Sequence, residues 1–586
     1  MTTSATAMLG ALTSLVTGRG GEERPHYRRL YAGVLVFFLI FLGIPVALIF
    51  GQSLFEKGVF TAANWTSVLS RADFWEMLGN SFTVSTLAAL VATVLGFIAA
   101  YGLNESELPD GVKKVVRIVL LLPLFLPSIT YGFAVIYSFG RMGLVSQIFG
   151  PPPFSIYGFW GLLIADVAYL LPPVFLIICN AFLYVDPRFA IVSRVMGDGP
   201  LRRFWTTALR PVAGACISAF MLGFFLTFTD FGIPISIAGE YEVIATKLYE
   251  TMMGAVPDFG RGAVVAISMM VPAVFAVLIL RKSEKLNFRN ADVAKRIPEH
   301  NPVRDAVFVG YFVLLALGLL AVFAVMFVVP FVENWPYKPA FTLRHVVSVL
   351  GDDDIVGIYF RSIGVALASA AIGTFLSFAA AMIEARSKLP AVCRSAMDAL
   401  AMITSTLPGM VIGVGFLFAF SGTFLQNTVA ILILANLVHF FATPYLMGTS
   451  ALSRMNAGWE TTGLLMGDTW LESVRRIVLP NARATLIEMF ELYFINSMVT
   501  ISAVVFLCGT STMLLTTKIK EFSYYERFDA IFVLSLLVFL TNIAAKLLLD
   551  WLADRSRIGS DSGREDPVDV SDERPNTPSV HAVPAL

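Results

Sequence analysis

Long apolar runs separated by short polar stretches make up most of this chain. A transmembrane helix needs about 20 apolar residues to cross the hydrocarbon core of a bilayer, and twelve runs approach or exceed that length. We expect each run to form one membrane span. The expected spans are 31–51, 82–103, 115–139, 157–185, 212–238, 262–280, 306–331, 362–383, 396–420, 428–448, 484–508 and 530–550.

The runs form two groups of six, on either side of a charged linker. This grouping predicts an all-α polytopic membrane protein whose 12 transmembrane helices form a 6+6 internal repeat. The end of the chain is rich in Ser, Asp and Pro, so we expect disorder there. The expected parts are a cytoplasmic N-terminal tail (1–30), a first half (31–280), a cytoplasmic linker (281–305), a second half (306–550) and a disordered cytoplasmic tail (551–586).

Two polar stretches, 190–211 and 460–480, interrupt the two groups at matching places. Each stretch carries Met-Gly-Asp, then paired arginines, then a proline before the next apolar run, and the two glycines are 270 residues apart. The pattern predicts a duplicated helix-turn-helix held outside the membrane. Its candidate residues are Met196, Gly197, Asp198, Arg202, Arg203, Leu209 and Pro211 in the first stretch, and Glu460, Met466, Gly467, Asp468, Arg475, Arg476, Leu479 and Pro480 in the second.

Lysine and arginine predict the orientation of the chain, because they concentrate in cytoplasmic loops. The linker holds seven of them, and the first polar stretch holds Arg194, Arg202, Arg203 and Arg210. The connection between the third and fourth runs holds Arg141 alone. We therefore predict that both polar stretches, and both termini, face the cytoplasm.

Composition excludes several classes of protein. With 57% hydrophobic residues and a mean hydropathy of +0.75, the chain is too apolar for a soluble protein of this size. The formal net charge is zero, which gives no basis for nucleic-acid binding. The four cysteines are scattered singly, so we expect neither a disulfide framework nor a metal site. The dipeptide Gly-Lys is absent, so the chain has no P-loop for a nucleotide.

The two polar stretches resemble the EAA loop of binding-protein-dependent ABC importer permeases, whose pattern is E-A-A-x3-G-x9-I-x-L-P. In the second stretch Ile477, Leu479 and Pro480 stand where this pattern asks, counted from Gly467. The first stretch is looser, because its proline comes one residue late. Neither stretch has the first glutamate in register, since Ile191 and Thr461 stand there and Glu460 is one residue early.

This resemblance implies a type I ABC importer permease fold, in which each loop is a cytoplasmic coupling helix seated in a groove of an ATPase subunit. It also implies that ATP and Mg are bound by that partner, a cytoplasmic ABC ATPase homodimer, so that this chain has no cofactor and is not an enzyme. A periplasmic or lipid-anchored solute-binding protein would deliver the cargo at the bacterial inner membrane. The alternative is an ordinary amphipathic loop between membrane helices.

Polar residues inside the runs are candidates for a translocation path, because ionisable groups in a membrane are costly. Gly232 and Pro234 predict a helix break in the fifth run, and the eleventh run has an equivalent polar stretch. Two such stretches facing each other would line a path at the interface of the repeats. The candidates are Thr227, Thr229 and Asp230 in the first half and Asn496, Ser497, Thr500 and Ser502 in the second.

Other intramembrane polar groups have two interpretations each. Asp230 has either a structural role, as a helix-end cap or in a pair with a residue of the partner half, or a role in lining a cavity. For Glu488 and Glu491 we favour interfacial or interhelical hydrogen bonding, and for His439 a packing hydrogen bond, over a substrate role. Asp166 in the fourth run stays a second candidate for the path.

The stretches 229–250 and 487–507 resemble fused permeases assigned to 2-aminoethylphosphonate import, and ferric-iron permeases share this layout and Asp230-Phe231-Gly232. We expect a phosphonate importer, because hydroxyl and amide groups outnumber carboxylates in the two facing segments. Ferric iron is the alternative cargo. The alternative mechanisms are an ion-gradient-driven secondary transporter, a membrane enzyme and an ABC exporter.

Overall fold

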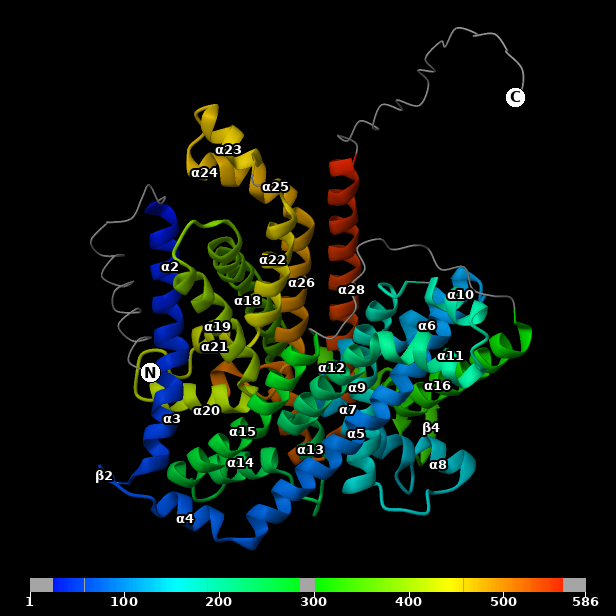
Figure 1. Ribbon diagram of the computed structural model, residues 1–586. Helices are drawn as coiled ribbons and strands as arrows, with labels where there is room; N and C mark the ends of the chain where they lie inside the picture. The colour runs from blue at the N-terminus through cyan, green and yellow to red at the C-terminus, as the bar shows by residue number, and fades with distance from the viewer. Residues whose placement is uncertain (1–24, 57, 187, 285–300, 457, 562–586) are drawn as a thin grey trace, which may run out of the picture.

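The structure is a computed structural model that describes residues 25–56, 58–186, 188–284, 301–456 and 458–561. The expected tail up to residue 24, the linker from 285 to 300 and the end of the chain from 562 lie outside the described residues. Figure 1 shows two groups of helices side by side, with α23 and α24 projecting at one end.

The first half contains five helical segments that are long and apolar enough to cross a membrane, with shorter helices between them. Its elements are α2 (Pro25–Phe38), η1 (Leu39–Gly43), α3 (Ile44–Leu54), β1 (Phe55–Glu56), β2 (Val59–Phe60), α4 (Ala63–Leu69), α5 (Ala72–Glu105), α6 (Asp110–Leu121), η2 (Leu122–Phe125), α7 (Ser128–Phe139), α8 (Leu144–Phe149), α9 (Phe159–Phe182), α10 (Arg188–Val195), α11 (Pro200–Phe204), η3 (Trp205–Leu209), α12 (Arg210–Thr229), α13 (Gly232–Ile237), α14 (Ile244–Met253) and α15 (Phe259–Glu284).

The second half repeats the main elements of this order. Its elements are α16 (Pro302–Val328), η4 (Val329–Phe331), β3 (Val332–Asn334), β4 (Lys338–Phe341), α17 (Arg344–Leu350), α18 (Asp353–Arg386), α19 (Ala391–Thr406), α20 (Gly409–Phe420), α21 (Val429–His439), α22 (Ala442–Arg454), α23 (Gly458–Leu465), α24 (Trp470–Ser473), η5 (Val474–Val478), α25 (Leu479–Asn481), α26 (Arg483–Val499), η6 (Thr510–Thr512), α27 (Leu515–Tyr524) and α28 (Phe528–Asp561).

The repeat extends to details that the sequence did not predict. In each half the first helix is followed by a small antiparallel hairpin, β1 with β2 and β3 with β4, in which Phe55 pairs with Phe60 and Val332 with Phe341. A seven-residue helix and then a helix of 34 residues follow in both halves. The chain is mostly helical, as the all-α fold class predicts, and these two hairpins are an addition whose strands are too short to leave an alternating pattern.

Eight helices in the described part of the chain are long and apolar enough to cross a membrane, and counting three bent helix pairs as spans raises the number to eleven. The expected span 484–508 overlaps α26, which has only 17 residues and ends at Val499. The expected total of twelve spans therefore stays a prediction. A multi-span helical membrane protein is confirmed.

The Leu-Pro pairs of the third span in each half break the helix instead of kinking it. The chain bends by 108° at Leu126-Pro127 and by 102° at Leu407-Pro408. Proline has no amide hydrogen to donate and disfavours helical backbone in the residue before it. A new helix therefore starts after each proline. The fourth spans differ between the halves. Pro173 stays inside the continuous helix α9, whereas the chain bends by 54° between α21 and α22, just before Pro444.

The two halves interlock through their first helices. α2 and α3 pack against α18 and α20 of the second half, and α16 packs against α5, α6 and α7 of the first half. The contacts are close, since Phe38 and Phe441 have ring centroids 4.5 Å apart and the Tyr311 hydroxyl donates to the Leu95 carbonyl at 2.6 Å. The halves therefore share one apolar core.

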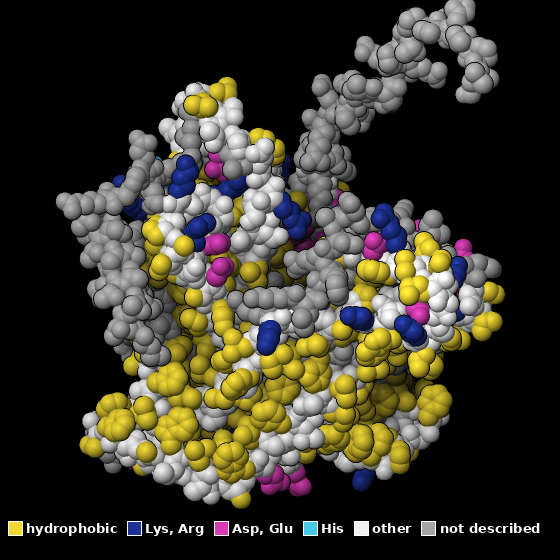
Figure 2. Space-filling view, in the orientation of Figure 1, with side chains coloured by type: hydrophobic (Ala, Val, Ile, Leu, Met, Phe, Trp, Pro, Cys, Tyr) yellow, Lys and Arg dark blue, Asp and Glu magenta, His cyan; other side chains and the backbone are white. Residues whose placement is uncertain are grey.

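Charged side chains gather at one end of the molecule. Figure 2 shows hydrophobic side chains over the lower part of the visible face and most Lys and Arg side chains in its upper half and across its middle, below the projecting α23 and α24 of Figure 1. We expected a disordered tail from residue 551, but residues 551–561 are helical and belong to α28, which ends at Asp561.

Candidate coupling loops and translocation path

Both polar loops fold as two short helices joined at a glycine in the left-handed region. In the first loop α10 and α11 flank Gly197, whose φ is 74°, and in the second α23 and α24 flank Gly467, whose φ is 93°. An L side chain rarely adopts this backbone, whereas glycine does so freely. The turn therefore explains why glycine occupies both positions, and the helix-turn-helix prediction is confirmed in both halves.

The aspartate after each glycine closes the turn from inside. The Asp198 amide donates to the Ser193 carbonyl at 3.1 Å, and the Asp468 amide donates to the Gly463 carbonyl at 3.0 Å. The Asp198 carboxylate is 3.1 Å from Arg202 Nε. These contacts give the repeated aspartates a role in the fold of the loop itself.

One arginine of each predicted pair holds its own loop. Arg202 binds Asp198 in the first loop, and in the second Arg476 Nη1 lies 2.8 Å from Asp468 Oδ1. Arg475 is exposed. The two loops thus use arginines at different places in the pair for the same internal contact.

After the second short helix, each loop passes through a five-residue π-helical segment, η3 or η5. Leu209 ends η3, and Pro211 lies in the first turn of α12. In the second loop Leu479 and Pro480 open α25. Proline suits the first turn of a helix, where its missing amide hydrogen costs no bond. The late proline of the first loop therefore keeps the same structural place.

Matching apolar side chains are exposed on the two loops. Met196 is 70% exposed and Met466 is 82% exposed. Two further positions match at the same spacing: Val195 (83%) with Leu465 (84%), and Leu201 (81%) with Leu471 (65%). Contiguous exposed apolar side chains of this kind mark binding surfaces. We call these six residues the apolar triads, one on each loop.

Glu460 does not face outward. Its side chain is 11% exposed, and its carboxylate lies 3.5 Å from Arg386 Nε at the end of α18. The glutamate that stands one residue early in the resemblance pattern therefore ties the second loop to the transmembrane helices.

The first candidate path segment is a broken helix. α12 ends at Thr229, Asp230 is extended with ψ of 141°, and α13 begins at Gly232. The Asp230 carboxylate accepts a hydrogen bond from the Ile233 amide at 2.7 Å. The predicted break is confirmed, and the interpretation of Asp230 as a helix-end cap has its geometry in the structure.

The threonine hydroxyls beside this break donate hydrogen bonds to backbone carbonyls of their own helix. Thr227 Oγ1 donates to the Gly223 carbonyl at 3.0 Å, and Thr229 Oγ1 donates to the Phe225 carbonyl at 2.8 Å. Asp166, one helix away in α9, is 3% exposed, and its Oδ1 has no hydrogen-bond partner among the described residues. Asp166 Oδ1 could therefore accept a hydrogen bond from a cargo without losing an existing one, whereas the hydroxyls of Thr227 and Thr229 already donate to their own helix.

The second half breaks at the equivalent place. α26 ends at Val499, Thr500 is extended with ψ of 138°, and the chain then runs without regular helix to Gly509. The Thr500 carbonyl accepts from Thr516 Oγ1 at 2.8 Å. Ser497 is buried, and its hydroxyl has no partner within the described part of the chain, whereas Asn496 and Ser502 are half-buried.

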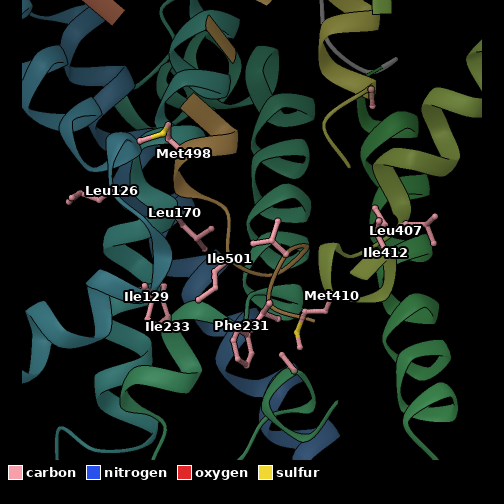
Figure 3. Close-up of a cluster of buried hydrophobic side chains, with 14 of the residues drawn as sticks. Leu126, Ile129, Leu170, Phe231, Ile233, Leu407, Met410, Ile412, Met498 and Ile501 are labelled. Atoms are coloured by element: carbon pink, nitrogen blue, oxygen red, sulfur yellow. The ribbon is translucent and has the colours of Figure 1, made fainter. Parts of the chain in front are cut away.

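Apolar side chains fill the space beside both breaks. Figure 3 shows Phe231, Ile233 and Ile129 from the first half near Met410 and Ile501 from the second. Each of these five residues is at most 2% exposed. The structure is therefore closed at this level.

Glu491 and His439, two other polar candidates, both contact neighbouring side chains. Glu491 Oε1 lies 2.6 Å from Lys546 Nζ of α28, which agrees with the interhelical interpretation. His439 ends α21, and its ring stacks at a tilt on Phe440 with centroids 4.5 Å apart. Its Nδ1 has no hydrogen-bond partner among the described residues, so the expected packing hydrogen bond is missing at that atom.

Comparison with known proteins identifies the kind of protein that this chain is similar to. Residues 373–558 match the family described as binding-protein-dependent transport system inner membrane component. The ferric transport system permease protein FbpB of Actinobacillus pleuropneumoniae is 22% identical over 542 residues, which cover 90% of this chain and 78% of that protein. The putative FbpB 1 of Haemophilus influenzae is 22% identical over 498 residues, covering 82% and 77%.

A shorter relative matches a smaller part of the chain. The molybdenum transport system permease protein ModB of Mycobacterium tuberculosis is 25% identical over 236 residues, which cover 38% of this chain and 88% of that protein. The chain is thus similar along most of its length to the FbpB proteins and over one part to a ModB of half the size. It is a permease of the ABC importer class, built as two fused halves.

Proposed function

We propose that this chain forms the translocation path of an ATP-driven importer and receives two ATPase subunits on its Gly197 and Gly467 loops. The observation that carries the proposal is the pair of apolar triads. Because the exposed positions match residue for residue on two loops of one fold, the same partner surface fits both. This favours an ATPase homodimer over two unlike subunits.

The orientation follows from the charges. Most Lys and Arg side chains visible in Figure 2 lie in the half of the molecule that carries α23 and α24, and such residues favour the cytoplasmic side. The start of α2 and the end of α28 lie at that same end in Figure 1. We therefore assign both termini and both coupling loops to the cytoplasm of a bacterial cell, and the breaks at Asp230 and Thr500 to the path.

The relatives change our ranking of the cargo. The FbpB proteins are named for ferric transport and ModB for molybdenum transport, and neither name supports 2-aminoethylphosphonate. We therefore place ferric iron first and the phosphonate behind it. A periplasmic or lipid-anchored binding protein would deliver the cargo to the outer side.

Co-purification tests the coupling assignment. The double variant Leu201→Asp with Leu471→Asp puts a charge into each apolar triad, so we expect at least a tenfold loss of bound ATPase, roughly what removal of a binding hot spot costs. Phe424→Asp is the matched control, since Phe424 is 88% exposed on the connection between α20 and α21. Equal ATPase binding by the wild type and the double variant would contradict the assignment.

A further inference from the structure

Two short helices, α14 and α27, are held in the same way in the two halves. Each has ten residues. The Ile244 amide that opens α14 donates to Ser81 Oγ of α5 at 2.8 Å, and the Leu515 amide that opens α27 donates to Ser362 Oγ of α18 at 2.9 Å. These helices are therefore equivalent elements of the repeat, each fixed to the 34-residue helix of its half.

Equivalent residues of the two helices touch each other. Tyr249 of α14 and Lys520 of α27 are 271 residues apart, the same spacing as Ile244 and Leu515. Lys520 Nζ donates to the Tyr249 hydroxyl at 2.5 Å and lies 4.1 Å from the centroid of its ring. Where residues related by a two-fold repeat touch, their contact lies on the axis between the halves. The Tyr249–Lys520 pair therefore marks that axis.

The pair lies directly beside both helix breaks. The Tyr249 ring centroid is 5.0 Å from that of Phe231, the residue after Asp230, and 5.8 Å from that of Phe506 in the second irregular segment. α27 is bonded to the second break through Thr516. In Figure 1 α14 lies at the end of the molecule away from α23 and α24. The pair is thus at the far side of the breaks from the coupling loops.

Lys520 differs from the other lysines of these two helices in its partners. Lys247 lies within 4.0 Å of carboxylates of Glu242 and Glu250, and Lys518 lies 3.0 Å from Glu521. No carboxylate of the described residues lies within 4.0 Å of Lys520 Nζ, which contacts a phenol and a ring face instead. A cation–π contact leaves the positive charge of the ammonium in place. The axis therefore carries a cation that no anion of the described chain neutralises.

We propose that Tyr249 and Lys520 form the outer gate of the path and that Lys520 selects an anionic, oxygen-rich cargo. The inference rests on the importer function proposed above and gives the class of its substrate. In the closed state Tyr249 accepts from the ammonium. When the halves part on the outer side, the ammonium is released and its three N–H donors bind the oxygens of the cargo. An anion that binds only the parted state shifts the equilibrium toward it.

This chemistry narrows the possible cargo. A bare Fe³⁺ ion would be repelled by the ammonium, whereas a molybdate, a phosphonate or ferric iron carried as an anionic citrate complex would be attracted. The shared feature is a negatively charged group with several oxygen acceptors. The three cargoes are separate arms of the test.

Uptake into proteoliposomes that contain the chain, its ATPase and its binding protein tests the gate. Molybdate, 2-aminoethylphosphonate and ferric citrate are offered in turn. For the transported cargo, Lys520→Met is expected to raise KM at least tenfold, about the effect of losing a charge-assisted hydrogen bond. Lys520→Arg is expected to keep KM within about threefold, because it keeps the charge.

Lys518→Met is the matched control, since Lys518 lies on the same helix but has a carboxylate partner. Co-purified ATPase shows that each variant folds, and the gate is measured only on variants that bind it at the wild-type level. Unchanged KM in Lys520→Met, with wild-type uptake present, would overturn the gate. Absence of ATP-driven uptake by the wild type with every cargo would instead overturn the importer function.

Tyr249→Phe removes only the hydroxyl acceptor of the gate, and we expect the cargo to leak faster through this variant in the absence of ATP.

Discussion

The two coupling loops share a backbone but differ in what supports it. Both have a left-handed glycine, an aspartate that closes the turn and an exposed apolar triad. The second loop adds a capping box, in which the Thr469 amide donates to Glu472 at 2.8 Å, and Trp470 stacks on His26 with ring centroids 5.0 Å apart. In the first loop Gly199 stands at the helix start without a side-chain cap.

This difference separates what both loops need from what only one has. The turn and the triad recur, so we assign them to contact with the ATPase. The cap, the stacked ring and the Glu460 ion pair are confined to the second loop, so we assign them to its rigidity. We expect changes of the first kind to act at either loop and changes of the second kind to act at the second loop alone.

Replacement of the turn glycines is expected to have the largest effect. Nothing lies within 4 Å of a Cβ added at Gly197 or Gly467, so Gly467→Asp and Gly197→Asp meet no clash at that atom. Their cost is backbone strain of about 1–3 kcal/mol, because both positions have a positive φ, and each aspartate places a charge at the partner surface. We expect each to reduce ATP-driven uptake at least tenfold. Gly467→Asn has the same shape without the charge and separates strain from repulsion. Wild-type uptake by both aspartate variants would rule out coupling through these turns.

Loss of the ion pair is expected to have an intermediate effect at the second loop only. Arg386→Met removes one cation from beside the buried Glu460 carboxylate; breaking a fully buried pair costs about 3–5 kcal/mol, and the cost is smaller here. The readout is ATPase activity stimulated by the binding protein, and we expect it to fall several-fold. Arg386→Met combined with Glu460→Gln should recover part of it. If the double variant were as impaired as the single one, the ion pair would not be the cause.

Protonation of the capping box is expected to have the smallest effect. Hydrogen bonds from the Thr469 amide and hydroxyl lower the pKa of Glu472 below its usual value. A lowered folded-state pKa stabilises the loop above the unfolded-state pKa, and this stabilisation is lost as the pH falls through the folded-state value. Glu472→Gln should therefore lower the thermal midpoint slightly at pH 7 and leave it unchanged at strongly acidic pH. An equal shift at both pH values would disprove the role of the charge.

Sequence patterns predicted the parts of this fold that single residue types enforce. Gly197 and Gly467 were visible because a left-handed turn requires glycine, and the break near Asp230 followed from Gly232 and Pro234. The 108° bend at Leu126-Pro127 was not predictable from the proline alone, because the packing of neighbouring helices decides the angle.

The apolar triads were missed for a different reason. Val195, Leu201 and their partners look like any other apolar residues in a chain that is 57% hydrophobic. Only the structure shows that they are exposed. The signal was their place beside Met-Gly-Asp at the same spacing in both halves. Likewise, Tyr249 and Lys520 stood at repeated positions, but no pattern along the chain shows that the repeats meet there.

The most direct test of coupling between this chain and a separate ATPase is the ATPase rate of the reconstituted complex. The chain, its ATPase and its binding protein are placed in proteoliposomes, and ferric citrate, molybdate and 2-aminoethylphosphonate are added in turn. We predict that one cargo raises the rate severalfold, only with the binding protein present, and that Leu201→Asp with Leu471→Asp abolishes this response. A chain that transports its cargo with no associated ATPase, driven by an ion gradient, would contradict the account.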